Sequence, residues 1–246
     1  MSAYRPCVLI PTYNNPATIR DVVTRARRHV PDVVVINDGS GPEARAVLDA
    51  LAAEGAALVH HRGANGGKGA AVKDGLTVAA ERGFTHALQV DADGQHDLDD
   101  IPKLLEASRA SPEALVLAAP VFDESAPKAR RMGREITRFW TNVEAGGPVI
   151  HDPMCGFRVY PVAAARATHT RGDAMDFDPE IAVRLVWAGT AVINVPTRVR
   201  YIPREQGGVS HFRMVRDNAL ISWMHTRLML TRIARAVVPS GEGARR

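Results

Sequence analysis

Short, wholly apolar runs alternate with segments of helical periodicity along the first half of the chain, and this alternation constrains the fold most. The runs occupy residues 7–10, 33–36, 58–59, 87–90 and 115–119. The first four are each followed by apolar residues spaced three or four apart, which is typical of an amphipathic helix. Strands that are apolar on both faces and separated by helices predict an α/β fold with a mostly parallel sheet flanked by helices.

Polar clusters follow three of these runs, at the points where the expected strands end. They cover residues 12–15, 37–40 and 91–97. Open sheets of this type bind ligands outside the carboxyl ends of their strands. The sequence therefore predicts a ligand site at this edge of the sheet.

The second half of the chain has a less regular pattern. Residues 123–138 are rich in arginine and have little apolar periodicity, so we expect an irregular segment there. The elements expected after it are a helix at 178–187 ended by Gly189, strands at 191–195 and 199–202, and a long helix at 211–237.

Composition excludes several classes of protein. The chain has 246 residues, of which 46% are hydrophobic, so it is too apolar for a disordered protein. Its longest apolar stretch without Asp, Glu, Lys or Arg, residues 185–197, has 13 residues, whereas a membrane-spanning helix needs about 18 or more apolar residues. Neither a signal peptide nor a disulfide framework is indicated, because the N-terminal apolar run is short and only two cysteines are present. We therefore expect a cytoplasmic protein.

Basic residues are concentrated near the C-terminus. Residues 198–246 hold ten Lys and Arg against three Asp and Glu, although the formal net charge of the whole chain is only +4. This distribution argues against a nucleic-acid-binding protein and indicates one basic face.

The long helix carries an apolar stripe beside its arginines. The stripe residues recur every three, four or seven positions: Phe212, Val215, Ala219, Trp223, Leu230, Ile233 and Val237. A basic amphipathic helix with a tryptophan is typical of peripheral binding to a membrane surface, here the inner face of the cell membrane. Alternatively, the stripe packs on the protein's own sheet or on a second subunit, which leaves a homodimer open.

Asp91 and Asp93 are the main candidates for chemistry at the predicted site. They flank one residue directly after an apolar strand, and two such carboxylates can bind a divalent cation and a sugar or phosphate beside it. Asp97 and Asp99 have the same spacing, but they are better explained as residues that cap the next helix.

A glycine-rich segment at residues 65–69 precedes the third expected helix. Lys68, at the start of that helix, suits an anionic ligand, although the segment lacks the pattern of a P-loop and also reads as a plain glycine turn. Asp38 follows the second strand, where it either binds a ribose or base edge or forms an Asx-turn with Gly39.

Four motifs occur in order at the expected strand ends: IPTYNN at 10–15, INDGS at 36–40, NGGKG at 65–69 and QVDADGQH at 89–96. This series resembles the family 2 glycosyltransferases with the GT-A fold, over about residues 6–211. DADGQH together with CGFR at 155–158 is most similar to the polyprenyl-phosphate branch, the dolichyl-phosphate mannose or glucose synthases. Residues 154–158 and 223–227 also resemble, more loosely, glycosyltransferases of bacterial aryl-polyene clusters, which act toward lipid-linked or acyl-chain products.

The resemblance implies a domain organisation and an activity. It implies a GT-A domain at 1–211, with a nucleotide-binding half at 1–120 and an acceptor half at 121–211, followed by a basic helical tail at 212–246. The activity implied is metal-dependent, inverting transfer of a sugar from a UDP- or GDP-sugar to a membrane-borne lipid acceptor, with a polyprenyl phosphate as the expected acceptor.

The resemblance also implies roles for individual residues. The donor-binding positions are Pro11, Thr12, Tyr13, Asp38, Lys68 and Asp91. Asp93 and Gln95 match the site of the catalytic Mg²⁺ or Mn²⁺, which offsets the charge of the leaving diphosphate. Arg204 matches an arginine that contacts phosphates, and Arg130 and Arg131 lie in the segment expected to flank the acceptor.

The chain departs from the polyprenyl-phosphate branch at two positions. Asn15 stands where relatives usually have glutamate, so one acidic donor contact is missing. The late loop has Ser210 and His211 where a lysine is common, which makes His211 the candidate acceptor contact at that position.

The need for a base depends on the acceptor. A phosphate monoester has a second pKa near 6, so it is already a nucleophile at neutral pH, whereas a hydroxyl needs a general base. Asp178 aligns with the base of hydroxyl-directed family members, but it is equally well explained as a helix N-cap. Both acceptor types therefore stay open.

Two other functions compete with this interpretation. A sugar-phosphate nucleotidyltransferase would have a glycine-rich loop with Arg and Lys after the first strand, where this chain has residues 11–13 (PTY). A non-catalytic, membrane-docked scaffold would not need both Asp91 and Asp93.

Overall fold

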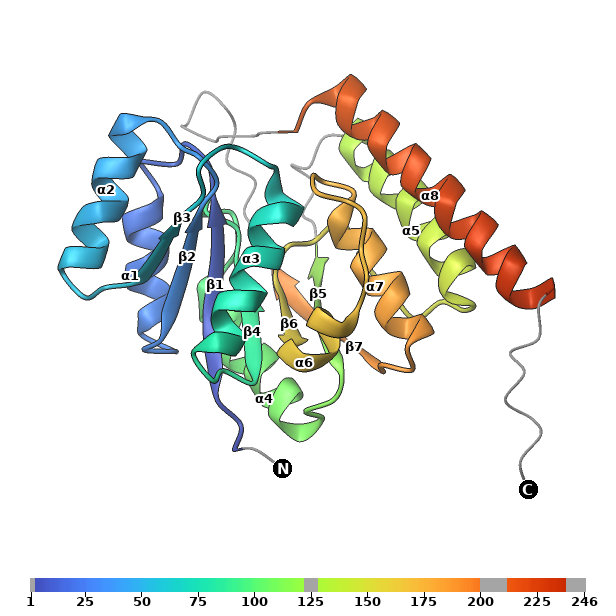
Figure 1. Cartoon of the computed structure of the whole chain (residues 1–246). Helices are drawn as coiled ribbons and strands as arrows, with labels where there is room; N and C mark the ends of the chain where they lie inside the picture. Colours follow the sequence, from blue (N-terminus) through green and yellow to red (C-terminus); the bar gives the residue numbers. More distant parts are fainter. Residues whose placement is uncertain (1–2, 122–127, 200–211, 238–246) are drawn as a thin grey trace.

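A seven-stranded sheet forms the centre of the protein, whose structure is a computed structural model that describes residues 3–121, 128–199 and 212–237 (Figure 1). The strand order is β3-β2-β1-β4-β6-β5-β7. The strands are β1 (Pro6–Thr12), β2 (Val33–Asn37), β3 (Leu58–His61), β4 (His86–Gln89), β5 (Leu115–Val121), β6 (Arg158–Pro161) and β7 (Val192–Arg198). All strand pairs are parallel except those of β6, so the mostly parallel sheet expected from the sequence is confirmed.

Helices cover both faces of the sheet because its strands are apolar on both faces. Val8 and Ile10 pack with α1 (Ile19–Arg27), α2 (Pro42–Ala53) and α4 (Ile101–Ala110). Cys7 and Leu9, which alternate with them along β1, pack on the opposite face of the sheet with α3 (Lys68–Glu81), α6 (Val162–Ala167) and α7 (Phe177–Trp187). Residues 98–100 form a short 3-10 helix, η1 (Leu98–Asp100), before α4.

The antiparallel strand β6 was not expected from the sequence. It lies between β4 and β5, and its first residue, Arg158, pairs with Gln89, the last residue of β4. Because β6 runs opposite to β4, the segment before Arg158 reaches the sheet at the carboxyl ends of the parallel strands. This arrangement brings residues 155–157 to the predicted ligand edge.

The irregular segment predicted for residues 123–138 is wrong in its described part, where α5 (Lys128–Ala145) is a helix. Its buried face carries Thr137, Thr141 and Glu144, which are spaced as on one side of a helix but are polar. The apolar residues that do recur at helical spacing, Ile136, Phe139 and Trp140, are exposed, so the sequence has no apolar face that corresponds to the buried side of this helix.

A single strand, β7, replaces the two strands expected between residues 191 and 202. Val199 makes one isolated antiparallel bridge with His96, and residues 200–202 lie outside the described part of the chain. The helix α7 ends at Trp187, and Gly189 follows it with a φ of +88°, as its expected role at the helix end requires.

The long C-terminal helix is present as α8 (Met214–Val237), and it packs on α7 and α5 (Figure 1). Its buried residues are Asp217, Ile221, Met224 and Leu228, and the three apolar ones form a cluster with Val183 of α7. Most of the predicted stripe lies on the opposite side: Trp223, Leu230 and Ile233 are between 54% and 60% exposed. Phe212 differs, because it is half-buried and packs against the Val183 cluster. The alternative in which the stripe packs on the protein's own sheet is therefore wrong for its residues on α8.

None of the helices in the described residues is both long enough and apolar enough to cross a membrane.

Candidate functional site

The candidate site lies where β1, β2 and β4 end, the edge predicted from the sequence. Asp91 follows β4, Lys68 begins α3, and Asp178 lies in the first turn of α7. These three elements are far apart in the sequence, and the parallel strand order brings their ends to one edge.

Lys68 joins the two carboxylates of this edge. Its ammonium nitrogen, Nζ, lies 2.8 Å from Asp91 Oδ1 and 2.9 Å from Asp178 Oδ2. Burial alone would lower the pKa of Lys68, but the adjacent carboxylates of Asp178 and Asp91 raise it well above its usual range. Lys68 is therefore a permanent cation at the centre of the site.

Asp91 has a second partner in His96. The His96 Nε2 lies 3.3 Å from Asp91 Oδ2, and the His96 ring packs against Phe157. Burial would raise the pKa of Asp91, but the charge of Lys68 and the contact with His96 lower it far below its usual range. Asp91 is consequently an ionised carboxylate at neutral pH.

Arg158 holds Asp178 from the other side, although its side chain is completely buried. Its guanidinium donates hydrogen bonds to the carbonyls of Pro153, Cys155 and Asp178. It also lies 3.8 Å from the Asp178 carboxylate. The Asp178 side chain is thus fixed between the cations of Arg158 and Lys68.

The interpretation of Asp178 as a helix N-cap is wrong. The helix α7 begins at Phe177, so Asp176 occupies the N-cap position and Asp178 is already helical. Its carboxylate contacts Lys68 and makes no cap hydrogen bond among the described residues. Asp178 is therefore a residue of the site.

Gly156 leaves room for the ion pair between Lys68 and Asp91. A Cβ atom at position 156 would lie 2.4 Å from Asp91 Oδ1 and 2.5 Å from Lys68 Nζ. Both distances are far shorter than any normal contact of a methyl group. A side chain at this position would have to displace Asp91 or Lys68.

Asp93 and Gln95 lie in the turn after Asp91. Asp93 Oδ1 accepts a hydrogen bond from the backbone N–H of Gln95 at 3.0 Å. Burial, and then the negative charge of Asp91, raise the pKa of Asp93. Unlike Asp91, this carboxylate has no cation within ion-pair distance among the described residues.

The chemistry of this turn fits a hard divalent cation. Carboxylate and amide oxygens are the ligands that Mg²⁺ and Mn²⁺ prefer, and a cation would compensate the half-buried charge of Asp93. Within the described ranges, no group of three or more His, Cys, Asp or Glu side chains is arranged to hold a metal. A cation at Asp93 would therefore need further oxygen ligands, which a diphosphate can supply.

Asp38 is buried and binds the glycine-rich segment. Its carboxylate accepts hydrogen bonds from the N–H groups of Gly66 at 2.9 Å and Gly67 at 2.8 Å, and it pairs with Arg62. Its carboxylate is thus engaged with this segment rather than in the Asx-turn considered for it, and the side chain of its neighbour Asn37 accepts a hydrogen bond from the Ser40 N–H three residues on.

The glycine-rich segment is consequently a tightly packed turn that presents Lys68. Gly67 has a φ of +101°, and a Cβ there would lie 2.4 Å from the carbonyl oxygen of Asp173. The N–H of Ala70 donates to that same carbonyl at 3.1 Å. Three N–H groups of the segment and the following turn are therefore engaged within the protein, and the turn directs the Lys68 side chain to Asp91 and Asp178.

The remaining donor-binding candidates border the same edge. Pro11 and Thr12 are buried at the end of β1, and Tyr13 is half-buried directly after it. The loop that follows is tied to the loop after β2, because the Gly41 N–H donates to the side chain of Asn14 at 2.8 Å. Asn15, which replaces an acidic residue of the relatives, is buried.

The acceptor candidates fall mainly outside the described side chains. Arg204 and His211 lie outside the described residues, and Arg130 and Arg131 belong to the first turn of α5, where side chains are not described. Asp97 caps η1 by accepting a hydrogen bond from the Asp99 N–H, as expected for that pair.

The sequence assigned no role to Gly156, Arg158 or His96, although the motifs at 155–158 and 89–96 contain them. Their roles depend on the antiparallel entry of β6 beside Asp91, which no sequence periodicity revealed. One signal was available in the sequence: Arg158 lies between the apolar residues Phe157 and Val159. An arginine in such a buried setting needs specific partners, which would have pointed to nearby carboxylates or carbonyls.

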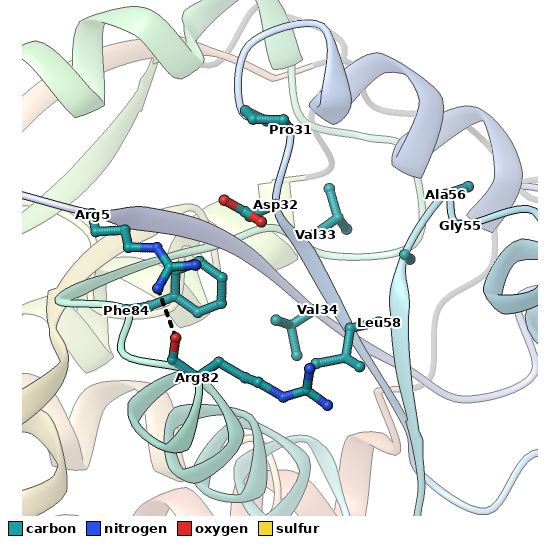
Figure 2. Close-up of a pocket in the computed structure, with 11 residues that line it drawn as sticks. Arg5, Pro31, Asp32, Val33, Val34, Gly55, Ala56, Leu58, Arg82 and Phe84 are labelled. Atoms are coloured by element: carbon teal, nitrogen blue, oxygen red, sulfur yellow. Dashed lines mark hydrogen bonds between the residues drawn. The ribbon is translucent and has the colours of Figure 1, made fainter.

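A cavity of the described structure lies at the opposite edge of the sheet (Figure 2). It is lined by residues at the amino ends of β1, β2 and β3, among them Asp32, Val34 and Leu58. Arg5 lies over the ring of Phe84 there and donates a hydrogen bond to the Arg82 carbonyl. This cavity contains none of the residues of the candidate site.

Comparison with known proteins gives relatives over most of the chain. An undecaprenyl-phosphate mannosyltransferase of Micrococcus luteus is 29% identical, over 82% of this chain and 86% of that protein. A polyprenol monophosphomannose synthase of Mycolicibacterium smegmatis is 28% identical, over 82% of this chain and 79% of that protein.

Solved structures agree on the fold. A crystal structure of glucosyl-3-phosphoglycerate synthase from Mycobacterium tuberculosis, in complex with Mn²⁺, uridine diphosphate and phosphoglyceric acid, superposes with a TM-score of 0.70. The two chains are 15% identical, and the match covers 98% of this chain and 81% of the other. At this identity the likeness establishes the GT-A fold alone.

The family assignment rests on the sequence. The profile of the family described as "Glycosyl transferase family 2" matches residues 7–168, which is well over half of the chain. This match agrees with the resemblance drawn from the four motifs, and it contradicts the alternative of a sugar-phosphate nucleotidyltransferase. The chain therefore belongs to glycosyl transferase family 2 and is a glycosyltransferase with the GT-A fold.

Proposed function

We propose that this enzyme transfers a sugar from a nucleoside diphosphate sugar to a polyprenyl phosphate, with inversion at the anomeric carbon and with Mg²⁺ or Mn²⁺ as cofactor. The observation that carries the proposal is the meeting of Asp91, Asp93 and Lys68 at the carboxyl edge of the sheet. Relatives named for transfer to undecaprenyl phosphate and for polyprenol monophosphomannose synthesis support the acceptor.

In this proposal the donor diphosphate lies at the edge between β1 and β4. Asp93 and Gln95 would hold the divalent cation, which offsets the charge on the leaving diphosphate when bound. Asp91, kept ionised by Lys68, accepts hydrogen bonds from a ribose or sugar hydroxyl. Pro11, Thr12, Tyr13 and Asp38 border the nucleoside part, with Asp38 fixing the turn that presents Lys68.

A phosphate acceptor suits the surroundings of Asp178. The Asp178 side chain is 4% exposed, and its carboxylate is engaged by Lys68 at 2.9 Å. Its other oxygen, Oδ1, makes no hydrogen bond with the described residues but is buried, so a hydroxyl acceptor would have to reach an enclosed atom. A phosphate acceptor needs no base, and Asp178 then serves to position Lys68.

The acceptor phosphate needs cations of its own. We assign this role to Arg130, Arg131, Arg204 and His211, the basic residues that the sequence places around the acceptor half. Guanidinium groups suit this task because they can bind phosphate oxygens in pairs. The reaction then takes place at the inner face of the cell membrane, where a nucleotide sugar and a lipid-borne phosphate can meet.

Substitution of Asp93 tests this proposal. We expect Asp93→Asn to lower sugar transfer and donor hydrolysis by roughly 100-fold or more, on the scale of losing one transition-state charge contact. The measurement is transfer of labelled sugar in Mn²⁺, with circular dichroism to show that the fold is intact. Asp99→Asn is the matched control, because the Asp99 side chain is 79% exposed and lies outside the site.

Two outcomes would contradict the proposal. Near wild-type rates in Asp93→Asn would remove Asp93 from the cation site. A wild-type protein that transfers no sugar to any acceptor while it still binds a nucleotide sugar would favour the scaffold alternative.

A further inference from the structure

The outer side of α5 and α8 is apolar and exposed. On α5, Ile136, Phe139 and Trp140 are between 41% and 61% exposed. On α8, Trp223, Leu230 and Ile233 are between 54% and 60% exposed. We refer to these six residues as the α5–α8 surface.

The two helices that carry these residues are neighbours. Both pack on α7 and contact one another, and they run side by side along one flank of the molecule (Figure 1). On α8 the exposed Trp223 and Leu230 lie opposite the buried Ile221 and Met224. On α5 the exposed Phe139 lies opposite the buried Thr137 and Thr141, and Ile136 and Trp140 lie between these two faces.

The charges around this surface are mainly positive. Arg213 and Arg216 are exposed at the start of α8, and its one acidic residue, Asp217, is buried and accepts a hydrogen bond from the Arg213 N–H. On α5 the exposed Glu135 is paired with Arg138. An apolar surface with two tryptophans and unopposed arginines complements the anionic headgroups and the acyl boundary of a lipid bilayer.

We propose that the α5–α8 surface docks the enzyme on an anionic membrane, with α5 and α8 lying together in the headgroup plane. The inference rests on the proposed function in one respect, that the acceptor is carried by a lipid. Both helices begin near the carboxyl edge of the sheet (Figure 1). Docking through them therefore brings the membrane beside the candidate site.

Vesicle binding by the full-length protein tests the proposal. The vesicles consist of phosphatidylcholine with or without phosphatidylglycerol, and co-sedimentation measures the bound fraction. Binding should need phosphatidylglycerol and weaken with salt, because the arginine contribution is screened. We expect Phe139→Ser on α5 and Trp223→Ser on α8 each to weaken binding roughly tenfold or more.

Matched control variants separate the surface from general effects. Val149→Ser removes an apolar side chain that is 40% exposed but lies on neither helix. Arg216→Gln on α8 should weaken binding to anionic vesicles, and Arg45→Gln on α2 is its control, because both arginines are exposed. The control variants should bind as the wild type does.

Tryptophan fluorescence identifies the docking face directly. The chain has three tryptophans, and Trp187 is set apart because its Nε1–H donates to the Glu144 carbonyl beneath Arg235. In variants that keep only one tryptophan, brominated lipid should quench Trp140 and Trp223 but leave Trp187 unchanged. Quenching of Trp223 alone would overturn the role of α5, and quenching of neither would overturn the docking face.

Two further outcomes would overturn the proposal. A protein that stays in the supernatant with anionic vesicles contradicts membrane docking. A dimer in solution that disappears in both Phe139→Ser and Trp223→Ser assigns the surface to a second copy of the chain.

Activity on a water-soluble, short-chain isoprenyl phosphate distinguishes the two proposals. Phe139→Ser and Trp223→Ser should keep wild-type turnover on this acceptor and lose it only on acceptors embedded in vesicles. If the wild type uses the soluble acceptor but binds no vesicles, docking fails and the proposed function stands. If it binds vesicles but glycosylates no isoprenyl phosphate, the proposed function fails and docking stands.

Discussion

Four charged residues at the edge of the sheet alternate in sign and hold one another in place. Arg158 contacts Asp178, Asp178 contacts Lys68, and Lys68 contacts Asp91. In a buried setting, such a series is stable only when every charge has a partner. Gly156 makes the series possible, because any side chain at position 156 would overlap the ion pair between Asp91 and Lys68.

Gly156→Ala tests this packing requirement. The added methyl group would overlap the Asp91 carboxylate and the Lys68 ammonium, so at least one of them has to move. Because misplacement on the order of 1 Å can cost roughly 100-fold in rate, we expect a loss of that size in kcat/KM. Gly63→Ala is the control, since a Cβ at Gly63 meets nothing within 4 Å. Wild-type activity in Gly156→Ala would contradict the assigned geometry.

Asp178→Asn separates a positioning role from that of a general base. If Asp178 only holds Lys68, Asp178→Asn should keep the wild-type pH dependence of transfer to a phosphate acceptor whatever the loss in rate, because Asp178 then removes no proton. The measurement is kcat as a function of pH with a polyprenyl phosphate acceptor. A loss of 100-fold or more, together with loss of the pH dependence, would assign Asp178 as the base.

Among the helices and strands, those whose buried residues are apolar were predicted best from the sequence. The strands β1, β2, β4 and β5, the helix α3 and the ligand edge follow from apolar runs and periodicity. The helix α5 was missed because its buried face carries Thr137, Thr141 and Glu144. The strand β6 was missed because four residues cannot reveal that they pair antiparallel with a distant strand.

The helix α8 also has a buried face that the sequence did not reveal. Its length and its exposed stripe were predicted, but the face that packs on the protein includes Asp217 and so was not distinguished from the polar side. Polar contacts reinforce this packing. The His225 Nδ1 lies 2.8 Å from Glu144 of α5, and Arg227 lies 3.6 Å from Glu180 of α7.

Glu180 connects these helices, and its substitution has a predictable pH dependence. The side chain is completely buried, accepts a hydrogen bond from the Gly172 N–H at 2.7 Å and pairs with Arg184 at 2.7 Å. Burial would raise the pKa of Glu180, but the Gly172 N–H and the Arg184 guanidinium lower it. A carboxyl with a lowered folded-state pKa stabilises the fold above its unfolded pKa, and this contribution is lost as the pH falls.

We therefore expect Glu180→Gln to lower the free energy of unfolding by roughly 3–5 kcal/mol at pH 7, because it leaves arginines without their partner. The difference from the wild type should be full above about pH 5 and shrink below about pH 4. Urea unfolding at both pH values measures it, with Glu106→Gln on the exposed side of α4 as the control. A difference that does not change with pH would contradict the ionised state of Glu180.

At the scale of the whole molecule, the sheet separates two tasks. Its carboxyl edge gathers the residues proposed to bind the donor and the cation, and the flank formed by α5 and α8 offers an apolar surface that begins near that edge (Figure 1). Two relatives of the chain are named as an undecaprenyl-phosphate mannosyltransferase and a polyprenol monophosphomannose synthase. A sugar donor from solution and an acceptor from a membrane would therefore approach the site from different directions.

Transfer to a polyprenyl phosphate, compared with transfer to the polyprenol of the same chain length, distinguishes the proposed acceptor from a hydroxyl acceptor. The full-length enzyme is incubated with labelled GDP- and UDP-sugars, in turn, with Mn²⁺ or with a chelator. We expect a labelled lipid product from the phosphate, only when the divalent cation is present, and none from the alcohol. Transfer to the alcohol but not to the phosphate, or equal transfer in the presence of the chelator, would rule out the proposed function.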